Sequence, residues 1–189
     1  MRFSATALLL ATATLAQAGT QLKAWYGDNC DPRFGTMCSY DNIDTTKDFD
    51  VCCGVGNYNW KSFELVTDLQ DAILTAYTGE GQCKTGPKVS VGPGECRNVD
   101  SGSTEWNGGV THLSLHVPRK NTGASASRRR RSERKCQKAD SEVLMVPHED
   151  GEGVVYREIP VGKEVEVERA ILRRDFVFLR ALPVADVHA

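Results

Sequence analysis

Short segments of alternating apolar and polar residues occupy the first two thirds of the chain, and they predict β-strands. Residues 60–66 alternate, so we expect Phe63 and Leu65 to face inward. Residues 110–117 also alternate, with Val110, Leu113 or Leu115 inward, but the register slips near residues 111–112 and leaves the faces unassigned. The pattern indicates an all-β fold for this part of the chain.

These strands belong to a weak internal repeat. Each copy opens with a strand ending in an aromatic residue, followed by a glycine- and acid-containing turn and a cysteine. A second cysteine near a glycine turn and a closing strand follow in each copy. The two units span residues 22–66 and 73–117, and together they predict one disulfide-rich β domain over residues 19–117.

The N-terminus predicts a secretory leader. Arg2 precedes an apolar run over residues 5–16, which ends in the small-residue pattern that signal peptidase accepts. We expect cleavage after Ala18 and a secreted, extracellular product. The apolar run is shorter than the roughly 20 residues that a membrane-spanning helix needs, so no membrane span is expected.

All seven cysteines follow the leader, and an oxidising compartment favours their pairing. The sequence contains neither a Cys-x-x-Cys pair nor a mixed cluster of cysteines and histidines, which are the patterns typical of metal sites. We therefore expect no metal or other cofactor. Adjacent cysteines can hardly bridge each other, so Cys52 and Cys53 need different partners. The spacing leaves fifteen pairings open for six cysteines, with Cys136 as the odd one. The six disulfide candidates are Cys30, Cys38, Cys52, Cys53, Cys83 and Cys96.

Charge divides the predicted mature chain into three parts. Residues 19–117 carry 7 basic and 13 acidic side chains, residues 118–138 carry 9 and 1, and residues 139–189 carry 6 and 11. The net charge of the whole chain is only −2, which argues against a chain-wide nucleic-acid surface. The basic part has no large apolar residue, so we expect a flexible linker there.

The arginine run at residues 128–131 has three interpretations. In a secreted chain, a kexin-type protease would recognise Arg130 and Arg131 and cut after Arg131, releasing 58 residues. The run could instead be a solvated linker, or a nuclear-localisation or phosphate-binding patch. Cys136 could tether a released piece if one N-terminal cysteine were free for it.

The tail, residues 139–189, has the most ambiguous secondary-structure pattern of the chain. Residues 143–159 predict a hairpin with a Gly/Asp turn, and residues 165–168 predict a third strand. Residues 169–182 fit either a helix or a buried strand. The tail could be a released peptide, a pro-segment or a second small module.

The opening strand with its aromatic and cysteine, the later Gly-x-Cys and the closing strand resemble the small secreted βγ-crystallin-like proteins of fungi. The resemblance covers residues 22–117 and implies two Greek-key motifs of four strands packed as a β-sandwich. It also implies that Cys83 pairs with Cys96 and Cys30 with Cys52 or Cys53, with Cys38 taking the remaining partner. The family's calcium motif falls on residues 57–62 and 107–112. The first stretch keeps only Asn57 and Ser62 and the second only Asn107 and Thr111, half of the ligands in each, so calcium binding is not expected.

The sequence contains no nucleophile and base in a known catalytic motif, and we expect a non-enzymatic protein. His112 and His116 have a spacing that would suit a metal pair on a helix, but they fall in a predicted strand without a third ligand. We therefore expect a fungal effector, a virulence protein acting on a host or competitor by surface recognition. Its expected partner is an extracellular protein or cell-surface target, and we expect a monomer. The alternatives are a toxin, antimicrobial or protease inhibitor of βγ-crystallin-like type and, more weakly, a small secreted hydrolase.

Overall fold

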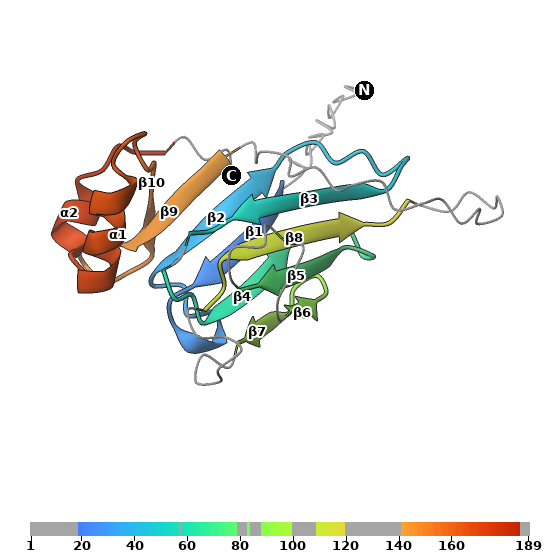
Figure 1. The fold of residues 1–189 in the computed structure, drawn as a ribbon, viewed down its shortest axis with the longest axis horizontal. Coiled ribbons are helices and arrows are strands. Elements are labelled where there is room, and N and C mark those ends of the chain that lie inside the picture. The colour runs from blue at the N-terminus through green and yellow to red at the C-terminus, as the bar shows by residue number, and fades with distance from the viewer. Residues whose placement is uncertain are drawn as a thin grey trace, which may run out of the picture.

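A computed structural model describes residues 19–56, 58–78, 83, 88–99, 109–119 and 141–185. Two antiparallel sheets form the body of this part of the chain (Figure 1). The prediction of an all-β sandwich stapled by disulfides is confirmed. The predicted leader with Ala18, the arginine run with Arg130 and Arg131, and Cys136 all lie outside the described residues.

The two sheets contain six and four strands. The larger sheet has the order β10-β9-β2-β1-β4-β7, and the smaller one has the order β3-β8-β5-β6. The larger sheet consists of β1 (Thr20–Trp25), β2 (Gly35–Tyr40), β4 (Ser62–Val66), β7 (Cys96–Asn98), β9 (Ser141–Pro147) and β10 (Val154–Arg157). The smaller sheet consists of β3 (Phe49–Gly54), β5 (Ile73–Tyr77), β6 (Lys88–Val91) and β8 (His112–Val117).

The strand order relates the two repeats by a regular exchange. The first unit contributes β1 to β4, which span residues 20–66, and the second contributes β5 to β8, which span residues 73–117. Part of the larger sheet reads β2-β1-β4-β7, and the smaller sheet read backwards is β6-β5-β8-β3. β1, β2 and β4 lie in the larger sheet in the same relative order as β5, β6 and β8 in the smaller sheet. The third strand of each unit lies in the other unit's sheet, so β3 is in the smaller sheet and β7 is in the larger sheet. The two sets of four strands are therefore arranged in the same relative order.

The hydrophobic core lies between the two sheets. Phe63 and Leu65 are fully buried, as the alternation in their strand predicts. Leu113 and Leu115 are also fully buried, on the closing strand of the second repeat. The core also encloses Trp60, whose indole N–H donates a hydrogen bond of 2.7 Å to the carbonyl oxygen of Val55.

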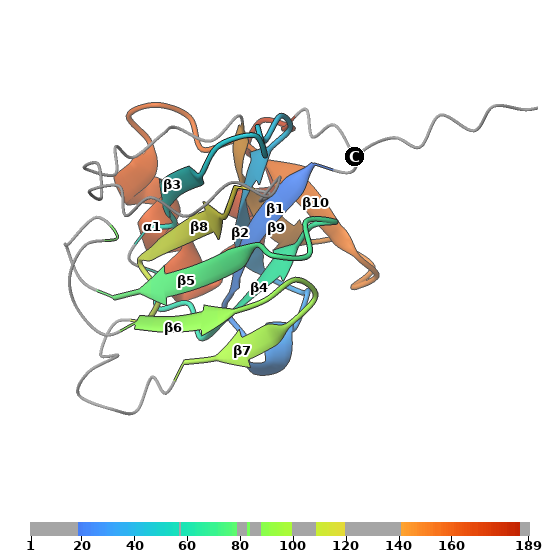
Figure 2. The same cartoon turned by 90° about the vertical axis from the view of Figure 1, so that its right-hand side faces the viewer.

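The tail adds strands to the larger sheet. β9 pairs with β2 on one side and with β10 on the other, so the predicted hairpin over residues 143–159 is confirmed. The turn between β9 and β10 contains Gly151 and Gly153, both with positive φ. Strands from both sides of residue 117 therefore share one sheet (Figure 2).

Two helices follow the hairpin: α1 (Glu164–Arg173) and α2 (Phe176–Arg180). The predicted third strand over residues 165–168 is wrong, because these residues form the first turns of α1. The buried residues of α1 have helical spacing: Val167, Ala170 and Ile171. This longer helical periodicity outweighs the alternation of the four residues 165–168. The helices lie beside β9 and β10 at one end of the molecule (Figure 1). Among the described residues, no helix has the length and apolar character needed to cross a bilayer.

Candidate functional site

The six disulfide candidates form three disulfides. As predicted, Cys52 and Cys53 have different partners. The bonds are Cys30–Cys96, Cys52–Cys83 and Cys38–Cys53, with Cα–Cα distances of 5.9, 6.1 and 6.6 Å. No other cysteine remains to bond Cys136 within the chain, so the predicted tether to the N-terminal part is not available.

The pairings implied by the family resemblance are wrong. Cys83 does not pair with Cys96, and Cys30 pairs with neither Cys52 nor Cys53. The reason is the exchange of the third strands between sheets. The cysteine that follows the opening strand of each unit meets the third strand of the other unit, which gives Cys30–Cys96 and Cys83–Cys52.

Cys38–Cys53 has a different role. It joins β2 of the larger sheet to β3 of the smaller sheet, and both cysteines are buried in the core. It therefore links the two layers covalently at the edge of the smaller sheet.

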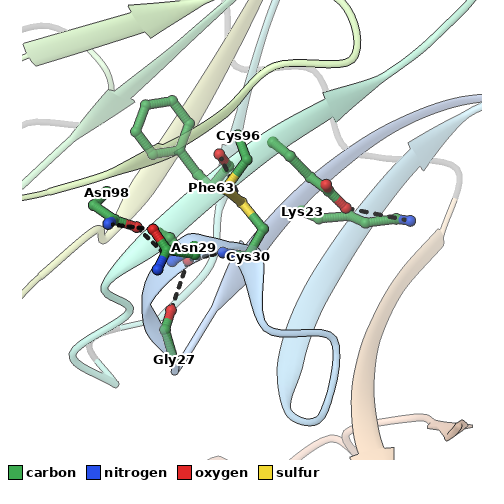
Figure 3. Close-up of a disulfide and its surroundings, with 9 residues drawn as sticks. Lys23, Gly27, Asn29, Cys30, Phe63, Cys96 and Asn98 are labelled. Atoms are coloured by element: carbon green, nitrogen blue, oxygen red, sulfur yellow. Dashed lines mark hydrogen bonds and ion pairs between the residues drawn. A yellow bond between two sulfur atoms is a disulfide. The ribbon is translucent and has the colours of Figure 1, made fainter.

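Polar contacts around Cys30–Cys96 fix the short 3₁₀ turn η1 (Asp28–Cys30) after β1 (Figure 3). The backbone N–H of Asn29 donates to Oδ1 of Asn98 at 2.6 Å, and Nδ2 of Asn98 donates to Oδ1 of Asn29 at 2.9 Å. The buried hydroxyl of Ser62 donates to the carbonyl oxygen of Gly27 at 2.6 Å and accepts from the N–H of Cys30 at 3.0 Å. The turn is thereby anchored to β4 and β7.

This anchored turn forms one wall of a pocket of about 300 Å³. Residues of the N-terminal part and of the tail both contribute to the pocket. It is lined by Tyr26, Gly27, Asp28, Asp31, Arg33, Phe34, Lys61, Pro147, Arg174 and Phe176.

Aromatic rings pack together along the pocket. The ring centroids of Phe34 and Phe176 lie 5.5 Å apart in an edge-to-face arrangement, and those of Tyr26 and Phe34 lie 5.9 Å apart. The guanidinium of Arg174 lies over the ring of Tyr26, 5.2 Å from its centroid. Arg174 is the C-cap residue that follows α1, and its left-handed conformation, with φ of 54°, turns the chain at this point. The pocket therefore combines a ring surface with a positioned cation.

Three cationic and two acidic side chains line the pocket. Arg33 forms a bidentate ion pair with Asp31, and its hydrogen bonds hold the pKa of the Asp31 carboxyl below its usual range. Within the described parts of the chain, no carboxylate forms an ion pair with Lys61 or Arg174. Two cations at the pocket are thus available to an anionic group, since Asp31 already neutralises Arg33.

The histidines of the second repeat have protein partners. Nδ1 of His116 lies 2.9 Å from a carboxylate oxygen of Asp50 on the neighbouring strand β3, and Nδ1 of His112 lies 3.0 Å from the Thr111 hydroxyl. Groups of three or more histidine, cysteine, aspartate or glutamate residues that could hold a metal are absent from the described residues.

Two residues that match the calcium motif, Ser62 and Thr111, form hydrogen bonds within the fold. Ser62 bonds the turn after β1, and the Thr111 hydroxyl donates to the carbonyl oxygen of Tyr77 at 3.3 Å. Asn57 and Asn107 lie outside the described residues. The two hydroxyls that resemble ligands therefore contribute to folding contacts.

The pocket could not be predicted from the sequence, because its walls are far apart in the chain. Arg174 and Phe176 come from the tail, whereas Tyr26 and Phe34 flank the first turn. The sequence around Tyr26 indicates only a turn next to an aromatic residue. Comparisons with protein-family models, curated proteins and solved structures find no match for this chain.

Proposed function

We propose that this chain is a secreted, non-enzymatic recognition protein, an effector of a filamentous fungus that acts on a host or competitor. Three disulfides suit an oxidising extracellular compartment. The exchange of third strands between two four-strand units supports the resemblance to small secreted βγ-crystallin-like proteins. The disulfide frame would hold recognition loops in a fixed shape.

The pocket beside η1 is the observation that carries this proposal. It presents aromatic rings together with Lys61 and Arg174, two cations without an ion-pair partner among the described residues. Cationic side chains form strong hydrogen bonds with carboxylate, sulfonate or phosphate oxygens, and aromatic faces pack on apolar groups. The expected ligand is an anionic group next to a ring or another apolar group, displayed by an extracellular partner.

An anionic aromatic dye, 8-anilinonaphthalene-1-sulfonate, tests the pocket directly. We expect saturable binding of one dye per protein and about fivefold weaker binding by the Arg174→Gln variant, equivalent to about 1 kcal/mol. Arg173→Gln is the matched control, because Arg173 ends the same helix but does not line the pocket. Equal affinities of the two variants would contradict the assignment of the pocket.

The biological part of the proposal needs a second assay. Purified protein applied to host tissue or to competitor cells should produce a response that Arg174→Gln weakens and Arg173→Gln preserves. A stoichiometric complex with a protease, or permeabilised cells with both variants equally active, would replace the effector assignment by an inhibitor or a toxin. Substrate turnover that one carboxylate substitution abolishes would replace it by a hydrolase.

We also propose that the chain is cut twice on its way out of the cell, after Ala18 and after Arg131. The leader and the arginine run of the sequence support these two cuts. Intact mass under denaturing conditions should give two chains, residues 19–131 and 132–189. A single chain of residues 19–189 would refute processing at the run.

A further inference from the structure

The tail is built into the larger sheet, which changes the expected result of a cut at the arginine run. β9 lies between β2 and β10, and its pairing with β2 runs from Gly35 opposite Met145 to Ser39 opposite Ser141. If the tail left, the backbone groups of β2 that bond to β9 would lose these partners. An edge of this kind favours pairing with a strand.

The side chains of β9 are buried on both faces of the sheet. Leu144 and Val146 belong to the main core, and Val143 and Met145 belong to a second apolar cluster with Trp25 of β1. The helices add three fully buried side chains, those of Val167, Ile171 and Leu179. Release of the tail would expose all of these groups to water, which strongly opposes dissociation.

The pocket also needs both parts of the chain. Tyr26 and Phe34 come from the N-terminal part, whereas Arg174 and Phe176 come from the tail. The edge-to-face contact of Phe34 with Phe176 and the cation–π contact of Arg174 with Tyr26 both cross between them.

We propose that the processed protein is a complex of two chains, in which residues 132–189 stay docked on β2 as a second subunit. The proposal rests on the proposed cut after Arg131. There, water adds across the Arg131–Ser132 peptide bond, leaving a carboxylate on Arg131 and an amino group on Ser132. The six cysteines before the run are all paired, so β-pairing and apolar burial hold the two chains together without a disulfide between them.

The experiment cuts the purified full chain in vitro with a kexin-type protease, and denaturing mass spectrometry verifies the two products. Size-exclusion chromatography and native mass spectrometry at micromolar concentration should then show one species with the mass of both pieces. The urea midpoint of the uncut chain should not depend on protein concentration, whereas that of the cut protein should rise with it. Elution of the 58-residue piece as a free peptide from a folded N-terminal piece would overturn the proposal.

A matched pair of variants tests whether β9 carries the association. Leu144 is fully buried opposite Thr36 of β2, whereas Leu172 on α1 is 56% exposed. In the cut protein, Leu144→Ala should raise the dissociation constant of the two pieces at least tenfold, and Leu172→Ala should change it less than twofold. Equal effects of the two substitutions would overturn docking through β9.

The two proposals fail separately. A single uncut chain in culture fluid would refute processing, while the chain cut in vitro still decides whether the pieces stay together. The association is measured without dye or ligand, so failure of the pocket to bind an anion leaves that result unaffected.

Discussion

The disulfide Cys30–Cys96 offers a quantitative test of how the fold is stabilised. The perturbation is the double substitution Cys30→Ser and Cys96→Ser. Cys96 is exposed and Cys30 is half-buried, so the change removes little packing from the core. The double substitution lowers the free energy of unfolding mainly because it gives the unfolded chain more conformational freedom.

The magnitude follows from the length of chain that the bond closes. Cys30 and Cys96 are 66 residues apart, which alone corresponds to about 4.3 kcal/mol in the chain-entropy model. The other two disulfides remain in the unfolded chain and shorten the path between these cysteines to about two dozen residues. The expected loss is therefore about 3.5 kcal/mol, or a fall of about 7–14 °C in the melting temperature.

Heating followed by circular dichroism, together with urea unfolding, both without reductant, measures this loss of stability. Arg97→Ser is the control, because Arg97 is an exposed neighbour of Cys96 on β7, and its substitution should cost less than about 0.5 kcal/mol. A loss below about 1 kcal/mol for the double variant would refute the loop-entropy argument. A non-reduced digest in which Cys83 is bonded to Cys96 would refute the connectivity itself.

Two further predictions concern a glycine and an ion pair. Gly109→Ala should destabilise the fold by at least about 2 kcal/mol more than Gly151→Ala in urea unfolding. Both glycines have positive φ, but only at Gly109 would the new Cβ lie 2.5 Å from the backbone oxygen of Trp60; equal losses would contradict this steric argument. Arg33→Ala should raise the pKa of Asp31 toward the ordinary value of an aspartate in a carboxyl NMR titration, because the hydrogen bonds and charge of the Arg33 side chain lower it in the folded state. The ion pair should therefore stabilise the fold above pH about 4, and this advantage over Arg33→Ala should vanish as the pH falls through the lowered pKa; an unchanged Asp31 titration would contradict it.

The opening and closing strands of the two repeats could be predicted from sequence, because short-range alternation reports burial on one face. Phe63 and Leu65 are buried as their alternation predicts. Which strands become neighbours is not encoded in this alternation. The third strand of each unit joins the other sheet, so the partner of Cys30 is Cys96, in the other repeat. The pocket follows from the same long-range arrangement and could not be predicted from either wall alone.

The sequence of the tail, in contrast, contains a signal for burial on both faces of a strand. Residues 143–146 are four consecutive apolar residues, and a strand without alternation is covered on both faces. An isolated two-stranded hairpin cannot bury both faces of one strand. In the structure, one face of β9 joins the main core, which also includes buried side chains of α1 and α2, and the other face joins the cluster around Trp25. The apolar run therefore indicates that the tail folds as part of the sandwich, and the same burial is why a cut before it should leave both chains together.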